Sequence, residues 1–465
     1  MQFQVIFSFI LVIFGLTTAD ASHSPLPLQS EIERRAVAYF VENSHPLTGL
    51  TLDKANNLAG PPQVDHVASI AATGFSLAVQ ANAAARGLLD WESTYRYVEK
   101  TLLFASTKLL RRNGWFYHFV DWKTGQREFT SEISTIDTSL FIAGALYAGK
   151  VFKNTKASHL ANELYANLDF YDFLTDGGQE PNKLTLSMGY LPECGYITTQ
   201  WDMYAEQMIL LILGLGHPQN PLPPEAWLAF SRTTKNELMG LDQALFVHQY
   251  SQLFLDLRDF KDAYGENYFD NSRSLSLLQR NIARHDETFK TYKAGYWGFS
   301  AGLAPLGYEV AHAKHYRSTA CVSCVLASVM FAPREVFGDL RLWLKNGASA
   351  PGASPLWSSP LSAFPLWASR VSSSLWGRYG LTDSVDIDNQ WISDLVLGIT
   401  VGPSYLSFAN LKAETSIWKH FMEIPPVKEG LVKAAKASLE DLPKLKPRRQ
   451  STRSQCYVQH SNSAK

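Results

Sequence analysis

Residues 140–146, L-F-I-A-G-A-L, belong to a predicted helix that carries apolar side chains on every face. A surface helix has a polar face, so a helix without one is expected to be buried. Several other helical segments share this property, and buried helices need a second layer of structure around them. The chain is therefore predicted to be all-α, with an inner ring of helices sheathed by an outer one.

Helical periodicity recurs along the chain, whereas strand signals are few and short. The segments with a helical period lie at residues 30–41, 66–84, 91–110, 133–151, 158–173, 200–215, 225–237, 245–257, 267–284, 319–331 and 405–421. Roughly a dozen helices in two layers are typical of an α/α toroid. The inner helix ends would converge on a funnel, and loops and short β-hairpins at one rim would carry the chemistry.

Composition describes a globular protein without an evident nucleic-acid partner. Apolar residues make up 46% of the 465 positions and charged residues 18%, which excludes a disordered chain. The formal net charge of -1 gives no electrostatic attraction for nucleic acid. The 12 Trp, 20 Tyr and 26 Phe residues fit a cleft lined with stacking rings, or simply a well-packed core.

Three segments divide the chain. Residues 1–21 resemble a secretory signal peptide, with an apolar core followed by Ala19-Asp20-Ala21, although no Lys or Arg precedes that core. Residues 22–425 would form the toroid, and residues 426–465 read as a basic tail without fixed structure. The Ser-, Ala- and Pro-rich residues 346–374 read as a long rim loop or a linker. We expect a secreted or periplasmic monomer without a membrane span.

Two carboxylates stand at the start of the buried helix. Residues 115–119 are aromatic and predicted to be extended, and the turn at 123–125 returns the chain toward Glu132 and Asp137. Acids and aromatic rings together suit carbohydrate chemistry, since a glycosidic bond is cleaved between two carboxyl groups. The alternative for Asp137 is structural, because Ser134 three residues earlier makes a capping box.

A third carboxylate, Glu206, is predicted to lie inside the nearly all-apolar helix at 200–215. Burial of an unpaired carboxylate raises its pKa. A glutamic acid with a raised pKa is suited to protonate a leaving glycosidic oxygen. The structural alternative is a buried Glu paired with an Arg or with a Tyr hydroxyl.

Several aromatic and polar side chains near these acids are candidate sugar ligands. They are Tyr117, His118, Trp201, Tyr204, His248, Gln249, Tyr250 and Trp297, the last of which is equally compatible with a core position. Asp256 and Arg258 read instead as a structural ion pair.

No metal or cofactor site is predicted. The spacing of His312, His315, Cys321 and Cys324 allows zinc, but the two cysteines lie in a small-residue helix where they are expected only to pack. Motifs for metalloproteases, nucleotide binding and serine hydrolases are missing from the sequence.

The blocks described above, in this order, resemble the glycoamylase-like family that includes bacterial endo-β-1,2-glucanases and the transglycosylation domains of cyclic β-1,2-glucan synthases. The matching pieces lie between residues 114 and 422: GWFYHFVD, SEISTIDTSLFIAGAL, YAEQMILLILGLGHP, LFVHQYSQLFLDLR, YFDNSR, YWGFSA, LWGRYGLTDS and IWKHFM. The resemblance implies an (α/α)6 toroid that hydrolyses β-glucan, of the β-1,2-linked type, with inversion. It implies Glu206, Glu132 and Asp137 as the acidic residues of the site.

The sequence departs from the family pattern in its C-terminal half. Gly302-Leu303 stands where an Asp-Gly pair is usual, and residues 316–319 replace an acidic piece. Thr400 begins the segment that replaces a D-Q-G-P-like loop, and Ala409 replaces the Glu of a Glu-Asn pair. Either the substrate differs, or some subsites are lost, or the protein no longer cleaves.

Two functions of different classes follow. In the first, the protein is a secreted glycoside hydrolase in which Glu206 donates a proton, while Asp137 or Glu132 activates or positions water. In the second, it is a glycan-binding protein on the same toroid without turnover. A toroidal lyase or a phosphorylase-like enzyme is a weaker third alternative, because a lyase needs a basic cluster in its cleft that the motifs do not contain.

Overall fold

The computed structural model of the chain describes residues 28–57, 65–174, 184–232, 237–346, 375–440 and 455–456. The predicted signal peptide at 1–21 lies outside these residues. So do nearly all of the expected rim loop at 346–374 and most of the tail beyond residue 440. Among the helices that are described, none combines the length and the apolar character needed to span a membrane.

Six helices form a closed inner ring in which each contacts the next and the last contacts the first. In chain order they are α2 (Ile70–Ala85), α4 (Thr135–Val151), α6 (Met208–Leu215), α7 (Leu245–Phe254), α10 (Val322–Leu326) and α13 (Gly398–Asn410). Nearly every residue of these helices is buried. The predicted toroid is therefore confirmed, and with it the expectation that a helix without a polar face lies inside.

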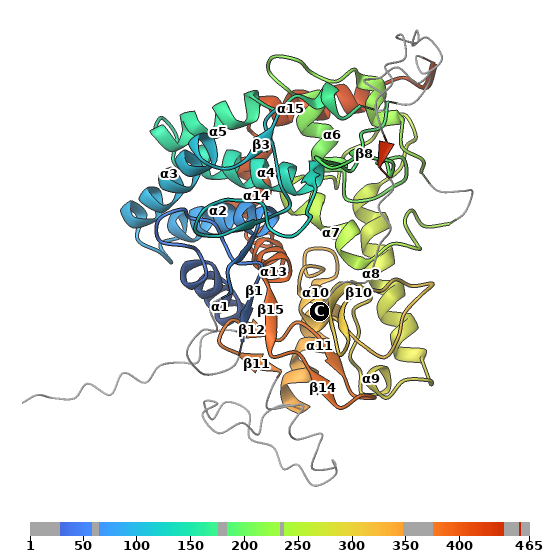
Figure 1. Ribbon diagram of the computed structural model, residues 1–465. Helices are drawn as coiled ribbons and strands as arrows, with labels where there is room; N and C mark the ends of the chain where they lie inside the picture. The colour runs from blue at the N-terminus through green and yellow to red at the C-terminus, as the bar shows by residue number, and fades with distance from the viewer. Residues whose placement is uncertain are drawn as a thin grey trace, which may run out of the picture.

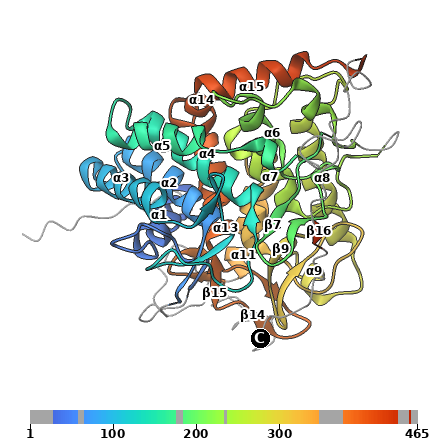
Figure 2. The same ribbon diagram turned by 45° about the horizontal axis from the view of Figure 1, so that its top comes forward.

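Helices with a polar face surround the ring (Figures 1 and 2). They are α1 (Leu28–Glu42), α3 (Trp91–Thr107), α5 (Lys156–Ala166), α8 (Tyr268–His285), α11 (Pro333–Asn346) and α15 (Pro425–Lys436). Short helical segments lie between them: α9 (Lys290–Lys293), α14 (Ile417–Phe421), η1 (Phe170–Asp172), η3 (Pro224–Leu228) and η5 (Ala413–Thr415).

Glycines allow two inner helices to touch backbone to backbone. A Cβ on Gly74 of α2 would lie 2.5 Å from the backbone of Phe141 in α4, and one on Gly144 would lie 1.9 Å from the Gly74 carbonyl oxygen. Only glycine fits at such an approach, since a methyl group there would force the helices apart. This close packing fixes the position of α4, whose N-terminal end carries Asp137.

Short strands, paired antiparallel except for β16 with β8, lie between the helices. The strands are β1 (Lys54–Asn56), β2 (Val67–Ser69), β3 (Arg111–Arg112), β4 (Trp115–Phe116), β5 (Phe119–Asp121), β6 (Ile133–Ser134), β7 (Gly189–Leu191), β8 (Gly195–Ile197), β9 (Ala301–Ala304), β10 (Gly307–Val310), β11 (Trp376–Gly377), β12 (Gly380–Leu381), β13 (Val385–Asp386), β14 (Trp391–Ile392), β15 (Leu395–Leu397) and β16 (Gln455–Cys456). Strand β1 pairs with β15 from the far end of the chain, and β2 pairs with β5. The first pairing joins the N-terminal segment to the start of α13, and the second joins the start of α2 to the strand that follows His118.

Several predicted boundaries were wrong. The segment at 66–84 begins as strand β2, and residues 405–421 contain the end of α13 followed by α14. At 225–237 only the short η3 forms among the described residues. The tail predicted to lack structure from residue 426 instead begins with α15, whose residues Val427, Leu431 and Ala434 are buried against the ring beside α6.

Candidate active site

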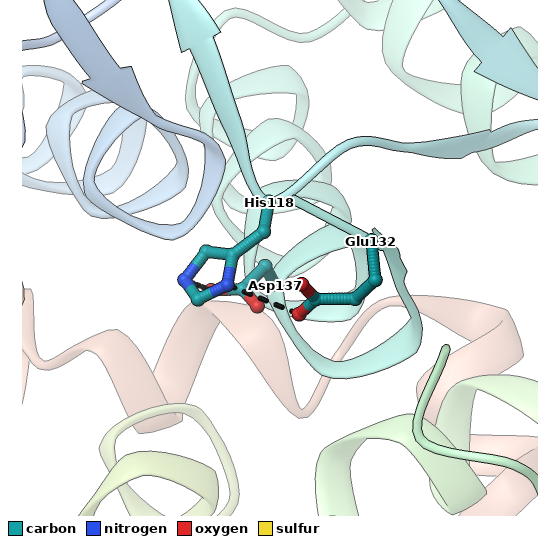
Figure 3. A group of neighbouring side chains, drawn as sticks. All are labelled: His118, Glu132 and Asp137. Carbon is teal, nitrogen blue, oxygen red and sulfur yellow. Dashed lines mark hydrogen bonds and ion pairs between the residues drawn. The ribbon is translucent and has the colours of Figure 1, made fainter. Parts of the chain in front are cut away.

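His118, Glu132 and Asp137 form a compact charged group (Figure 3). The His118 amide donates to the Glu132 carbonyl at 2.9 Å, so the aromatic limb and the returning limb hold the two side chains opposite each other. Nδ1 of His118 lies 3.1 Å from Oε1 of Glu132, and Nε2 lies 3.5 Å from Oδ1 of Asp137. One imidazole thus joins the two predicted carboxylates.

The two carboxylates keep His118 protonated. Burial disfavours the imidazolium, but the charges of Asp137 and Glu132 outweigh it and raise the pKa of His118 to about 9. Burial raises the pKa of Asp137 against the opposing effect of His118. The pKa of Glu132 is lowered, because the hydrogen bond and charge of His118 outweigh the desolvation of its carboxyl.

Asp137 also has the structural role that its spacing suggests. It is the third residue of α4, and its amide donates to Oγ of Ser134 at 3.2 Å, so Ser134 is the N-cap. The Ser134 hydroxyl donates in turn to Oδ2 of Asp137 at 2.5 Å. One carboxylate oxygen therefore faces the cap and the other faces His118.

Glu206 lies in the turn that precedes α6, not inside a helix as predicted. Ser251 of α7 fixes this turn, since its hydroxyl donates to the Glu206 carbonyl oxygen and accepts from the amide of Ile209. Burial and the negative charge of Asp137 raise the pKa of Glu206 to about 7. The raised pKa that was predicted for Glu206 is therefore present. Glu206 and Asp137 both lie where inner helices begin, Glu206 before α6 and Asp137 in the first turn of α4, and we call this end of the ring the ring mouth.

Two tyrosines bring phenol groups to the same acids. Burial raises the pKa of Tyr250 in α7, and the charges of Glu206 and Asp137 raise it further. The Tyr250 hydroxyl donates to the carbonyl of Ile399 at 2.7 Å. Tyr308 on the β9–β10 hairpin is half exposed, yet its pKa is raised by burial of the phenol and by the same two carboxylates. The hairpin thus brings the Tyr308 phenol within electrostatic reach of the acids.

Trp201 and Tyr117, two predicted sugar ligands, have protein partners of their own. The indole Nε1 of Trp201 donates to Oγ1 of Thr135, the first residue of α4, at 2.9 Å. Trp201 is 5% exposed, so little of its ring faces outward. Tyr117 is half-buried beneath the guanidinium group of Arg127.

Three predicted sugar ligands lie in the core. His248 is 1% exposed, lies 3.1 Å from the Gly240 carbonyl, and has its pKa lowered by burial to about 4. Gln249 donates to the Cys324 carbonyl and to the Ser328 hydroxyl. Tyr204 stacks on His248 and is buried. Their polar sequence context suggested a sugar, whereas the structure gives them packing partners within the ring.

Trp297 is also a core residue, so the expectation that it presents its indole to a sugar was wrong. It is 2% exposed, and Nε1 donates to Oδ2 of Asp339 at 2.8 Å. The pairing of Asp256 with Arg258 is confirmed at 2.6 Å.

Neither candidate set of metal ligands favours a metal. Cys321 and Cys324 form a disulfide with each other, which removes the two thiolates that zinc would need. The ligand atoms of His118, Glu132 and Asp137 lie within 4.8 Å of one another. Both imidazole nitrogens face a carboxylate, however, and a protonated histidine has no lone pair for a metal.

Three residues whose charges or phenol groups act on this site were not predicted. Asp53 precedes β1, and burial raises its pKa to about 6 against the opposing charge of His118. Tyr308 lies on a hairpin that no motif marks. Asp383 is fully buried and accepts from the Leu303 amide at 2.7 Å. Asp383 lies in the LWGRYGLTDS piece of the family resemblance, which gave it no role, and the only signal for Asp53 is a single acid that follows an apolar and small-residue stretch.

Comparison with known proteins agrees with the family resemblance. Residues 198–353 match the family model "Glycoamylase: Putative glucoamylase". The exo β-1,2-glucooligosaccharide sophorohydrolase (non-reducing end) of Parabacteroides distasonis is 21% identical over 90% of this chain. The chain spans 59% of that relative's length.

Solved structures share the fold. A "putative glucoamylase" of Bacteroides caccae superposes with a TM-score of 0.73 and 23% identity, covering 88% of this chain and 98% of the other. The endo-β-1,2-glucanase of Chitinophaga pinensis, solved with sophorotriose and glucose, gives a TM-score of 0.71 and 20% identity over 88% and 97% of the two chains. These likenesses confirm the helical toroid.

Proposed function

We propose that the protein is a glycoside hydrolase that cleaves β-1,2-linked glucan with inversion at the anomeric carbon. The observation that carries the proposal is the position of Glu206 in the turn before α6, where burial of its carboxyl, with a smaller contribution from the charge of Asp137, raises its pKa to about 7. The relatives described as acting on β-1,2-linked glucose supply the linkage.

In this mechanism Glu206 donates its proton to the departing glycosidic oxygen. Asp137 and Glu132, held by protonated His118, position the attacking water, directly or through a sugar hydroxyl. An inverting enzyme needs about 6.5–9.5 Å between its two acting carboxyl groups to leave room for the water. Tyr117 and Trp201 are proposed to border the sugar, as are Tyr250 and His118.

The test is incubation of the purified full chain with linear β-1,2-glucan and with β-1,3-, β-1,4- and α-1,4-glucans. Shortening of the β-1,2-glucan alone, with the α-anomer appearing first by NMR, is the expected result. Activity should fall as the pH rises above about 7, since the Glu206 proton is then lost. Unchanged chain lengths with every glucan at high protein concentration would reject hydrolysis.

The C-terminal replacements favour one rival, a protein that binds glycan without cleaving it. Thr400 stands where the family resemblance leads us to expect an acid, and its hydroxyl donates to Asp383. Binding of oligosaccharide by calorimetry, with no turnover and no effect of Glu206→Gln on the products, would favour the rival.

We also propose that the protein is exported as a monomer. Residues 1–21 have signal-peptide character, and the disulfide of Cys321 and Cys324 is typical of an oxidising compartment. Cys194 is disulfide-bonded as well. N-terminal sequencing of secreted protein should begin at Ser22, and sedimentation should give one chain's mass. Retention inside the cell would contradict export.

A further inference from the structure

Asp53 is held at the ring mouth by its backbone. Its amide donates to the Val67 carbonyl at 2.9 Å, and its own carbonyl accepts from the amide of Gly398, the first residue of α13, at 2.8 Å. The Tyr39 hydroxyl lies 3.2 Å from the same carbonyl. The position of Asp53 therefore depends on its main chain and leaves the carboxylate available for another role.

Strand pairing brings this position toward His118. Val67 begins β2, which pairs with β5 so that Ser69 lies opposite Phe119, the residue after His118. Leu52, directly before Asp53, bridges to Ala68 in the same β2 strand. Strand β2 therefore lies between the segment that contains Asp53 and strand β5, which directly follows His118. Asp53 is on the side of the ring where α13 begins.

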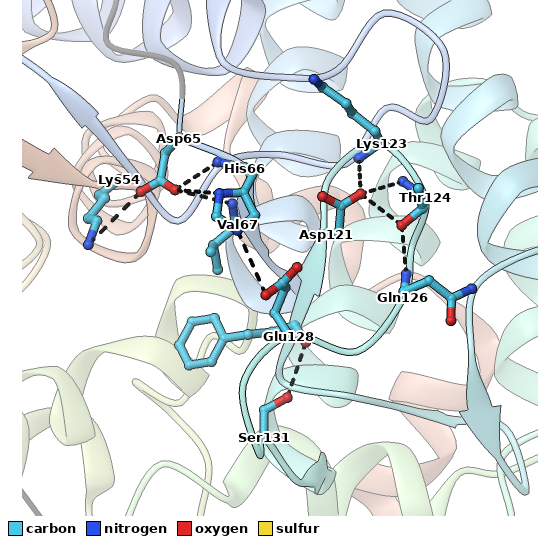
Figure 4. Close-up of polar contacts among 11 residues, drawn as sticks. Lys54, Asp65, His66, Val67, Asp121, Lys123, Thr124, Gln126, Glu128 and Ser131 are labelled. Atoms are coloured by element: carbon cyan, nitrogen blue, oxygen red, sulfur yellow. Dashed lines mark hydrogen bonds and ion pairs between the residues drawn. The ribbon is translucent and has the colours of Figure 1, made fainter. Parts of the chain in front are cut away.

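Asp53 lies within electrostatic reach of the same group. His118 favours its ionised form, whereas Asp137 and Asp65 oppose it, and the Tyr39 and Tyr308 phenols lie within reach of its charge. Lys54 is the remaining cation, and Figure 4 shows its ammonium group directed at Asp65, 4.0 Å away. Among described residues, no N–H or O–H donates a hydrogen bond to the Asp53 carboxylate.

The other candidate bases are engaged. Glu132 accepts from or pairs with Nδ1 of His118, and Asp137 is shared between the Ser134 hydroxyl and Nε2 of His118. A general base needs a lone pair directed at the water whose proton it takes. Asp53 is half-buried, which permits contact with water, and its charge reaches both the His118 group and Tyr308.

We propose that Asp53 is the general base of the hydrolysis, a role that rests on the proposed function. As the glycosidic C–O bond breaks, its oxygen takes the proton of Glu206. The water oxygen bonds to the anomeric carbon, and the water's proton passes to Asp53. Asp53 then loses this proton to solvent and Glu206 regains one, so atoms and charge balance over the cycle. Glu132, Asp137 and His118 remain positioning residues.

The test compares Asp53→Asn with Asp65→Asn, a neighbouring rim acid, in the full chain. Asp53→Asn should lower kcat on β-1,2-glucan about 10²–10⁴-fold with KM within a few-fold, while Asp65→Asn stays near wild type. Sodium azide, which needs no base, should restore turnover of Asp53→Asn as the α-glycosyl azide. It should not restore Glu206→Gln.

Each result decides a separate question. A wild type without hydrolysis contradicts the proposed function itself. An active wild type with kcat of Asp53→Asn within tenfold, or a folded inactive variant that azide does not rescue, overturns the assignment of Asp53. If Asp53→Asn melts early, Asp53→Glu replaces it, because that variant keeps the charge and moves the carboxylate. A kcat undiminished in Asp53→Glu would also overturn the assignment.

Discussion

Asp383 and Asp339 in the C-terminal half of the ring have different surroundings from Glu206 in the N-terminal half. In the C-terminal half, Asp383 accepts from the Leu303 amide and from the hydroxyls of Ser323, Ser384 and Thr400. Asp339 receives the guanidinium of Arg280 and the indole of Trp297. In the N-terminal half, Glu206 is half-buried, and no side chain in the described part of the chain donates a hydrogen bond to its carboxylate.

The comparison separates acids that build the fold from acids available for chemistry. A buried carboxylate surrounded by donors resembles a core residue, since its lone pairs are already used. A carboxylate whose burial is incompletely compensated holds its proton near neutral pH, as Glu206 does. Asp383 and Asp339 are therefore structural acids of the second half of the ring, whereas Glu206 in the first half is available for chemistry.

The largest effect is expected on catalysis, in a variant of Glu206. Glu206→Gln removes the proton donor while retaining its shape, so kcat on β-1,2-glucan should fall about 10²–10⁴-fold. The melting temperature near pH 6 should not fall. Reducing-sugar assays and calorimetry check both quantities. Glu128→Gln is the control, because Glu128 is another partly exposed acid, whose carboxylate pairs with His66 at 3.8 Å (Figure 4). Equal losses in both variants would contradict a special role for Glu206.

At Asp383 we expect a loss of stability, which Glu206→Gln should not show. Asp383→Ala leaves the Leu303 amide and three hydroxyls without their acceptor, so the free energy of unfolding should decrease by about 3 kcal/mol. Urea denaturation measures this change. Asp394→Ala is the control, because Asp394 is exposed and its substitution should change stability by less than about 0.5 kcal/mol. Equal stabilities of the two variants would show that Asp383 is not the structural acid inferred above.

A smaller effect sharpens the comparison at His118. Its folded pKa of about 9 exceeds the ordinary value of 6.5, so its stabilisation is fully present below about pH 6.5 and is lost as the pH rises through about 9. His118→Gln should therefore lower the free energy of unfolding by about 2 kcal/mol at pH 6. The difference should shrink by pH 10.

Denaturation at a series of pH values distinguishes this effect from a packing loss. His66→Gln is the matched control, because His66 is mostly exposed beside Asp65 and Glu128. A stability difference for His118→Gln that stays constant from pH 6 to 10 would mean that the ion pairs with Glu132 and Asp137 contribute nothing.

The sequence predicts the ring well because burial on every face is a local property. The helices α4 and α6 contain no polar stripe, and that pattern requires neighbours on all sides. Helix α15 escaped prediction because its apolar stripe is short and basic residues follow it. Its burial depends on contact with α6, which the local pattern does not contain.

The site was predicted in part for the same reason. Glu132 and Asp137 lie near each other in the sequence, and Glu206 stands out against apolar neighbours. Asp53 reaches them only through the pairing of β1 with β15 and of β2 with β5, which joins distant segments. Trp297 was predicted wrongly because the local sequence of a Trp beside a glycine turn is the same whether the indole faces a sugar or donates to Asp339, as it does here.

The smallest effect expected concerns the stability of Glu206→Gln. Because the folded pKa of Glu206 is raised from 4.5 to about 7, the unfolded chain ionises first, and this residue lowers stability progressively between those pH values. Glutamine does not ionise, so Glu206→Gln should gain about 1 kcal/mol relative to wild type at pH 8, after allowance for partial exposure, and nothing at pH 4. Urea denaturation at both pH values measures the gain. If the variant is less stable at pH 8, Glu206 is a donor-satisfied acid like Asp383, and the contrast between the halves fails.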